Sequence, residues 1–165
     1  MSGHWPPYPA YTNSGLDWLS EIPLHWRVTS MRHATESIGN GTTTTQMPAG
    51  DSDYPVTRIE TISSGEIDRS IVGYVEYFDG IEDYRLESGD VLLSHINSLP
   101  MVGNCALYSN GDNPLYHGMN LLRLRPASSV TGEWLLHWLK GALANEMVKS
   151  VAKHAINQVS VSITN

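Results

Sequence analysis

Short apolar runs separated by glycine-bearing turns occupy the middle of the chain. In order, they are YPVTRIETI (54–62), EIDRSIVGYVEYF (66–78), DVLLSHI (90–96), NCALYS (104–109) and MNLLRLRP (119–126). β-Branched and aromatic residues are enriched in strands, and short runs of this kind with turn residues between them are typical of antiparallel pairing. The pattern therefore predicts a mainly antiparallel, twisted sheet.

Helical spacing of apolar residues appears near the C-terminal end, in TGEWLLHWLKGALANEMVKSVA (131–152). Apolar residues recur there at positions 135, 138, 139, 142, 143 and 147, as on one face of a helix. Thr131 is the expected N-cap, Glu133 suits the first turn, and Trp134, Trp138 and Leu139 are expected in the core. A short helical turn is also predicted within residues 14–22, capped by Ser14 or Asp17 and ended by Pro23. Residues 27–38 fit a strand or a helix equally well.

These elements predict an α+β fold with a C-terminal-side amphipathic helix and a short N-terminal helical segment. Residues 1–14 contain Pro6, Pro7 and Pro9 and are expected to form a flexible arm. Residues 15–165 are expected to form a single domain, because 165 residues with 41% hydrophobic content can build one core.

Composition excludes several classes of site. The single cysteine, Cys105, cannot form an intramolecular disulfide, and the seven histidines lack H-x-H or H-E-x-x-H spacing, so no metal site and no cofactor is predicted. We find neither a signal peptide nor an apolar run long enough to span a membrane, and we therefore predict a soluble, cytoplasmic protein.

The net charge of -7 disfavours phosphate contacts when taken as a whole, but its distribution along the chain is uneven. Eleven acidic residues lie within 51–90 against three arginines, whereas 115–165 holds five lysines and arginines against two glutamates. Such an asymmetry indicates either one face for an anion and another for solvent or a protein, or chance clustering.

Ser94 and His95 directly follow the apolar run 91–93, which raises the alternative of a hydrolase. Neighbouring side chains on a strand point to opposite faces, so the two cannot hydrogen-bond each other. The flanking residues are also large, unlike the glycines of a nucleophile elbow. A strand that mounts a polar loop, Asn97 and Ser98 through Asn104, is therefore favoured, although the hydrolase stays as an alternative.

Two further polar segments have side chains suited to nucleic acid. Thr42, Thr43, Thr44 and Thr45 follow IGNG, and their hydroxyls could contact phosphates or base edges. Near the other end, KHAINQVSVSITN (153–165) contains Asn157 and Gln158, which suit bidentate contacts to adenine. The alternative for the threonines is an ordinary exposed turn or edge strand.

Several segments together resemble the specificity subunits of type I restriction-modification systems. YPAYTNSGLDWLSEIPLHW (8–26) is similar to their N-terminal signature. The remainder resembles their target recognition domain in the G-T-rich loop (38–45), YPVTRIETISSGEI (54–67), SGDVLLSHINS (88–98), the Trp134 helix and AINQVSVS (155–162). The chain departs from the pattern at His95, where an arginine is common, and at Val56-Thr57, where a tryptophan often follows the proline.

The resemblance implies a non-catalytic domain, the N-terminal half of a subunit that carries two such domains. It would bind one half of a bipartite double-stranded DNA site, while methyltransferase subunits and, in larger assemblies, a translocating nuclease subunit perform the chemistry. Half-subunits of this kind could self-associate. The candidate DNA-binding residues are Thr42, Thr43, Thr44, Thr45, Gln46, Arg58, Asn97, Ser98, Asn104, Lys153, His154, Asn157 and Gln158. A protein-interaction module that binds no nucleic acid is the second alternative.

Overall fold

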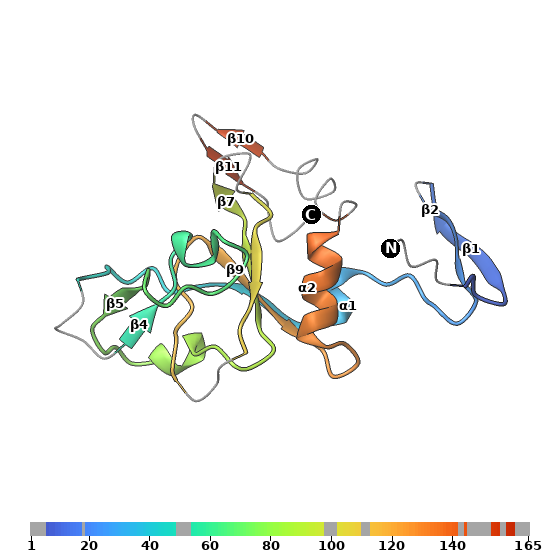
Figure 1. Cartoon of the computed structure of the whole chain (residues 1–165). Coiled ribbons are helices and arrows are strands. Elements are labelled where there is room, and N and C mark those ends of the chain that lie inside the picture. The colour runs from blue at the N-terminus through green and yellow to red at the C-terminus, as the bar shows by residue number, and fades with distance from the viewer. Residues whose placement is uncertain are drawn as a thin grey trace.

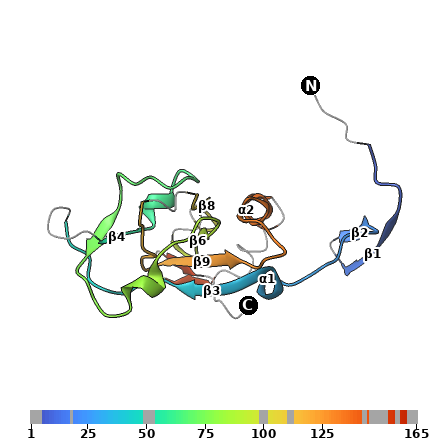
Figure 2. The same ribbon diagram turned by 90° about the horizontal axis from the view of Figure 1, so that it is seen from below.

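A four-stranded antiparallel sheet forms the centre of the computed structural model, which describes residues 6–17, 19–48, 54–97, 102–109, 113–141, 144, 153–155 and 158–160. Its strands lie in the order β3-β9-β6-β8, with bounds Thr35–Asn40 (β3), Val91–Ser94 (β6), Cys105–Leu107 (β8) and Leu121–Pro126 (β9). Figures 1 and 2 show this sheet between the remaining elements. The predicted α+β class with mainly antiparallel strands is confirmed.

Side-chain alternation along β6 divides the core between the two faces of this sheet. Leu92 belongs to one buried cluster, with Leu115 and Leu121, whereas Val91 and Leu93 belong to a second cluster on the other face. Helix α2 (Gly132–Lys140) covers the second face and packs against β6, β8 and β9. All four residues of β6 are buried, as expected of a strand covered on both faces.

Helix α2 begins where the sequence predicts. The Thr131 side chain accepts a hydrogen bond from the backbone N–H of Trp134, which satisfies a donor that the first helical turn leaves open. Leu139 is buried and Trp138 packs partly against the core. The prediction for Trp134 was wrong, because 53% of this residue is exposed. Positions 142, 143 and 147 lie outside the described residues.

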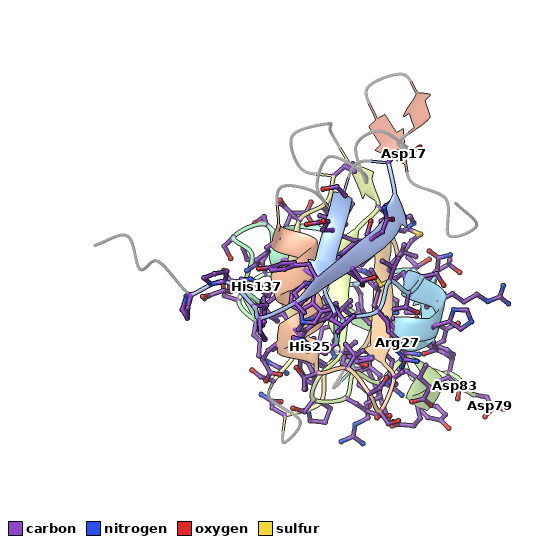
Figure 3. The ribbon with its side chains drawn as sticks, turned by 90° about the vertical axis from the view of Figure 1, so that its right-hand side faces the viewer. Asp17, His25, Arg27, Asp79, Asp83 and His137 are labelled. Atoms are coloured by element: carbon purple, nitrogen blue, oxygen red, sulfur yellow. The ribbon has the colours of Figure 1, made fainter. Side chains whose placement is uncertain are left out.

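The N-terminal helical turn predicted within residues 14–22 was also wrong. The strands β1 (Tyr11–Leu16) and β2 (Leu19–Pro23) form an antiparallel hairpin, which projects away from the sheet (Figures 1 and 2). Ser14 Oγ donates to the Leu19 carbonyl, so the proposed cap instead ties the two strands together. Figure 3 labels Asp17 at the turn of this hairpin.

Residues 27–38, which fitted a strand or a helix, contain both. Helix α1 (Met31–Ala34) is one turn long and leads directly into β3. The Thr35 hydroxyl donates to the Met31 carbonyl at 2.9 Å, within that turn. The junction places α1 at the beginning of β3, at the end of the sheet away from the loop that follows Asn40.

Two smaller sheets extend the structure. One pairs β4 (Tyr54–Val56) with β5 (Gly73–Val75), next to the 3-10 turns η1 (Glu60–Ile62) and η2 (Ile81–Tyr84). The other has the order β10-β11-β7, from Lys153–Ala155, Gln158–Ser160 and Ile96–Asn97. In the part of the chain that the structure describes, no helix is long and apolar enough to cross a membrane.

Candidate nucleic-acid interface

The topology of the central sheet gathers segments that are far apart in the sequence at one end of the sheet. β3 and β6 both run antiparallel to β9, and Asn40 and Leu93 both pair with Leu122. The two strands are therefore parallel to each other and end at the same edge, where β8 and β9 begin. We call this end the loop edge and define it by the described segments 41–48, 95–97, 102–104 and 113–120.

The threonine loop at this edge is pinned at both ends by backbone hydrogen bonds. Thr42 N–H donates to the His117 carbonyl and Met47 N–H donates to the Tyr74 carbonyl, each at 2.9 Å. Gly41 lies so close to Gly118 that a Cβ atom would overlap the Gly118 backbone. The loop between Thr42 and Met47 is consequently held in place at both ends.

The four threonines divide into two kinds. Thr42 is buried, and its Oγ1 lies 2.8 Å from Thr44 Oγ1 in a hydrogen bond. Thr43 and Thr45 are exposed. Two hydroxyls thus hold the loop together and two are presented to solvent, so only Thr43 and Thr45 are placed for contacts with a partner.

Arg58 reaches the same edge from the segment after β4. Thr57 N–H donates to the Tyr116 carbonyl at 2.9 Å, and the Thr57 hydroxyl accepts from Gly118 N–H at 2.9 Å. The next side chain, Arg58, donates from Nε to Gln46 Oε1 at 2.6 Å. Two candidate residues that are twelve positions apart are therefore in direct contact.

The segment after β6 differs from the expected loop. Asn97 lies in β7, where it pairs with Val159 of β11, while Ile96 pairs with Ser160. The loop assignment of Asn97 was therefore wrong. β11 in turn pairs with β10, which brings Lys153, His154 and Gln158 into the same small sheet as Asn97. Ser98 and Asn157 lie outside the described residues.

Asn104 precedes β8 at the loop edge and contacts a distant part of the chain. Its Nδ2 donates to the Ser63 carbonyl at 3.3 Å, and Ser94 N–H donates to the Asn104 carbonyl at 2.8 Å. At least part of its amide therefore secures the segment after η1. No residue pattern in the sequence indicated that structural contact.

Ser94 and His95 are both buried, at 1% and 7% exposure. Neither Ser94 Oγ nor His95 Nδ1 has a hydrogen-bond partner among the described residues, so they do not bond each other. Burial lowers the pKa of His95. The position at which an arginine is common in the family that the sequence resembles is therefore a buried histidine here.

The charge asymmetry of the sequence is partly neutralised within the fold. Arg125 donates to both carboxylate oxygens of Asp90, at 2.9 and 2.8 Å, and to Glu87 at 2.7 Å. Asp90 is 1% exposed, so this pair joins β9 to the beginning of β6 in the interior. Arg123 Nη1 donates to the Asp83 and Arg85 carbonyls. Arg125 is therefore paired with carboxylates of the acidic segment, whereas Arg123 contacts only neutral carbonyls of that segment.

The acidic segment around η2 lies away from the β7-β10-β11 sheet. Figure 3 shows Asp79 and Asp83 at the opposite end of the molecule from β10 and β11, and Figure 1 places η2 and this sheet on opposite sides of the body. Both aspartates are exposed. An anionic partner at β10 and β11 would therefore be remote from these carboxylates.

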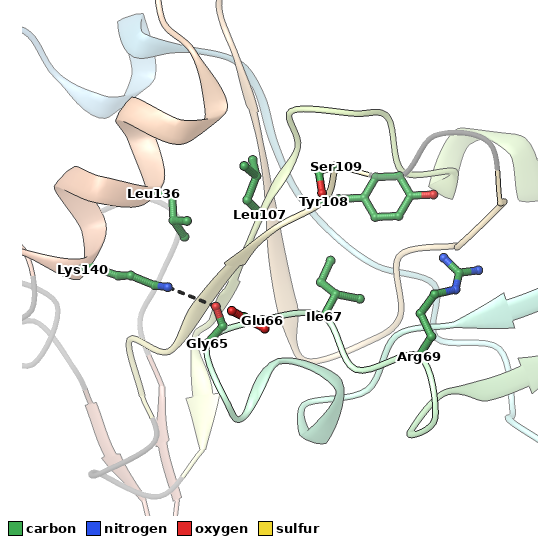
Figure 4. A pocket seen from close by; sticks show the side chains of 9 residues that line it. All are labelled: Gly65, Glu66, Ile67, Arg69, Leu107, Tyr108, Ser109, Leu136 and Lys140. Carbon is green, nitrogen blue, oxygen red and sulfur yellow. Dashed lines mark hydrogen bonds between the residues drawn. The ribbon is translucent and has the colours of Figure 1, made fainter.

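An open pocket of about 430 Å³ lies elsewhere, between α2 and residues 65–69 (Figure 4). Its two basic side chains are bonded to backbone carbonyls: Lys140 Nζ donates to Gly65 at 3.1 Å, and Arg69 donates to Asn113 and Pro114. The described residues contain no group of three or more side chains that could hold a metal ion. The pocket therefore offers no convergent catalytic or metal-binding set.

No protein-family model matches the chain. The chain is 42% identical over 149 residues to a Methanocaldococcus jannaschii protein provisionally named as the specificity subunit of type I restriction enzyme MjaX. The alignment covers 88% of this chain and 35% of that protein, so the chain spans about a third of its relative. A solved chain from a study of complex assembly and conformational transition of a type I restriction-modification system has a similar fold. Its TM-score is 0.59, with 22% identity over 84% of this chain and 32% of that one.

Proposed function

This chain is a homologue of part of a type I restriction enzyme specificity subunit, and we propose that it is a target recognition domain that binds one half of a bipartite DNA site. The domain would itself be non-catalytic. Methyltransferase subunits, and in larger assemblies a translocating nuclease subunit, would act on the DNA that it selects. We propose residues 15–165 as this single domain.

The observation that carries the proposal is the convergence of candidate side chains at the loop edge. Thr43, Thr45, Gln46 and Arg58 lie at this edge on segments fixed by backbone hydrogen bonds. β7 continues from it and connects to β10 and β11. Sites mounted on rigid elements hold their side chains in place, which base recognition requires.

The distribution of charge supports DNA at the β7-β10-β11 sheet, whereas η2 contacts segment 113–120 of the loop edge, where the Tyr116 hydroxyl donates to Glu82 at 2.9 Å. Asp79 and Asp83 lie remote from β10 and β11, where phosphates would otherwise meet carboxylates (Figure 3). The exposed acids could instead face a methyltransferase subunit. The chain spans about a third of its relative, which supports the proposal of one such domain, and self-association of two copies would supply a second half-site.

Burial of Ser94 and His95 argues against a hydrolase. A nucleophile must reach its substrate and must contact its base, whereas these two side chains are interior and not bonded to each other. The burial of Ser94 and His95 also supports a structural role for β6, as the rigid strand from which β7 continues.

Selection from a randomised duplex library tests the proposal. The purified chain would be incubated with the library at low salt, and the bound DNA would be sequenced. We expect enrichment of one short motif of fixed sequence. A bound pool with the composition of the input, or no binding at low salt, would refute a DNA-reading function and favour a protein-interaction module.

A further inference from the structure

We propose that Arg58 contacts a guanine of the target and that Gln46 is the residue that positions its guanidinium. This inference rests on the proposed function and deepens it, since it assigns one base and one side chain within the half-site. It follows from the contacts of the two side chains, the packing beneath them and the absence of an ion pair between Arg58 and a carboxylate within the part of the chain that the structure describes.

Gln46 fixes one side of the guanidinium. Arg58 Nε donates to Gln46 Oε1 at 2.6 Å, and both side chains are half-buried. Because an arginine nitrogen can only donate, the Gln46 oxygen must face it. That contact uses one of the two lone pairs of the Gln46 oxygen and sets the orientation of its amide.

The terminal nitrogens of Arg58 remain for a partner. Neither Nη atom donates a hydrogen bond to a residue that the structure describes, and neither is among the buried polar atoms without a partner. The two atoms therefore reach the surface. With Nε held, they form a planar fork of two donors, the geometry that matches O6 and N7 of guanine in the major groove.

Arg58 differs from Arg125 in the chemistry of its partner. Arg125 is paired with two carboxylates, whereas the Arg58 contact is a neutral amide. A neutral acceptor orients the guanidinium without cancelling its charge. The Arg58 guanidinium thus keeps its positive charge at the loop edge, while the Gln46 contact restricts its orientation.

The backbone of β5 limits the space around the pair on one side. Gly73 of β5 lies directly beneath it, and a Cβ atom at this position would overlap Gln46 Oε1 and approach Arg58 Nε to 2.8 Å. On the main-chain side, Arg58 N–H donates to Thr61 Oγ1 at 2.8 Å, and Thr61 is fully buried. The side chain therefore projects from a fixed base along a restricted path.

The experiment compares Arg58→Lys, Gln46→Met and the double variant in the randomised duplex selection. Lysine keeps the charge but has no planar fork, and methionine keeps the length of Gln46 but lacks the acceptor. We expect Arg58→Lys to reduce the preference for guanine at one motif position by roughly 5- to 150-fold, with the other positions unchanged. Gln46→Met should weaken the preference at that same position, and the double variant should resemble Arg58→Lys alone.

Arg32→Lys is the matched control, because Arg32 is an exposed arginine on α1 at the other end of β3. It should leave every position unchanged. Thermal melts of each variant identify loss of folding, and Gly73→Ala offers a second route to displacing Gln46. A preference retained in Arg58→Lys, or loss that is uniform across sequences as for a phosphate contact, would overturn the assignment while leaving the DNA-reading function intact. A wild-type chain that selects no motif would refute both.

Discussion

Asn97 of β7 lies opposite Val159 of β11 in an antiparallel pair. This pairing joins β7, which follows β6 directly, to a segment sixty-two positions later in the chain. The closing segment is thereby brought to the region of the loop edge. The proposed DNA-binding surface is thus built from segments whose proximity depends on the folded sheet.

Binding of DNA by the isolated chain should be weak and sensitive to salt. A domain with few unpaired basic residues neutralises few phosphates, so we expect a Kd of about micromolar or weaker, which weakens further as salt rises. Titration of a labelled duplex at two salt concentrations measures both quantities. Tight binding that does not respond to salt would contradict the electrostatic part of the proposal.

Leu92→Ala should destabilise the fold by roughly 2 to 5 kcal/mol, through loss of burial and an unfilled cavity. Leu92 is fully buried in β6, in the cluster that contains Leu115 and Leu121. Thr43→Ala is the matched control, because exposed substitutions usually change stability by no more than about 0.5 kcal/mol. Urea unfolding of both variants gives the comparison. Equal free energies of unfolding for the two variants would mean that β6 does not have the structural role proposed for it.

Asn97→Ala and Ser98→Ala should retain a melting temperature close to that of the wild type while weakening selection of the DNA motif. The β7-β11 pair is made by backbone groups, which an alanine at Asn97 preserves. Ser94→Ala, in contrast, should act only on packing and abolish no activity. Early melting of the Asn97 and Ser98 variants together with unchanged selection would make this segment structural.

Stability should fall as the pH decreases from about 6.5 to about 4. Burial lowers the pKa of His117 from 6.5 to about 4, and burial also lowers the pKa of His95. The unfolded chain binds protons in this range that the folded chain excludes, so the contribution of His117 is fully present above 6.5 and is lost on acidification. The loss amounts to about 1.4 kcal/mol per pH unit within that window.

Urea unfolding at several pH values checks this slope. His117 Nε2–H donates to the Leu121 carbonyl at 3.0 Å, a contact that raises the pKa and only partly offsets the effect of burial. His117→Gln should flatten the dependence relative to the wild type. Identical slopes in the two proteins would show that His117 does not titrate as its burial requires.

Local patterns predicted the parts of the fold that local physics determines. The apolar run 91–93 identified β6, and Thr131 identified the beginning of α2. The same reasoning failed where a side chain could form a different hydrogen bond with residues nearby in the sequence. Ser14 could cap a helix, but Gly15 adopts a φ of +76° and accommodates a turn-like irregularity, and Ser14 binds across the hairpin instead.

Contacts between distant segments could not be derived from the pattern. The pairing of Arg125 with Asp90 neutralises one of the eleven acidic residues in 51–90, and no spacing rule joins these two residues. The Gln46–Arg58 contact likewise depends on the position of β5 beneath it. Gln46 and Arg58 were both candidates from the sequence. Only the fold shows which of their atoms remain available to bind DNA.

Methylation-site mapping tests the central claim most directly. The chain would be expressed in its full-length context with its cognate methyltransferase, and methylated positions across the genome would be sequenced. The DNA-reading account predicts that the sites share one fixed half-sequence, and that alanine substitutions at Asn157 and Gln158 relax this half and leave the other half unchanged. Methylated sites without a fixed half, or a half-sequence that persists when this chain is replaced by an unrelated recognition domain, would contradict it.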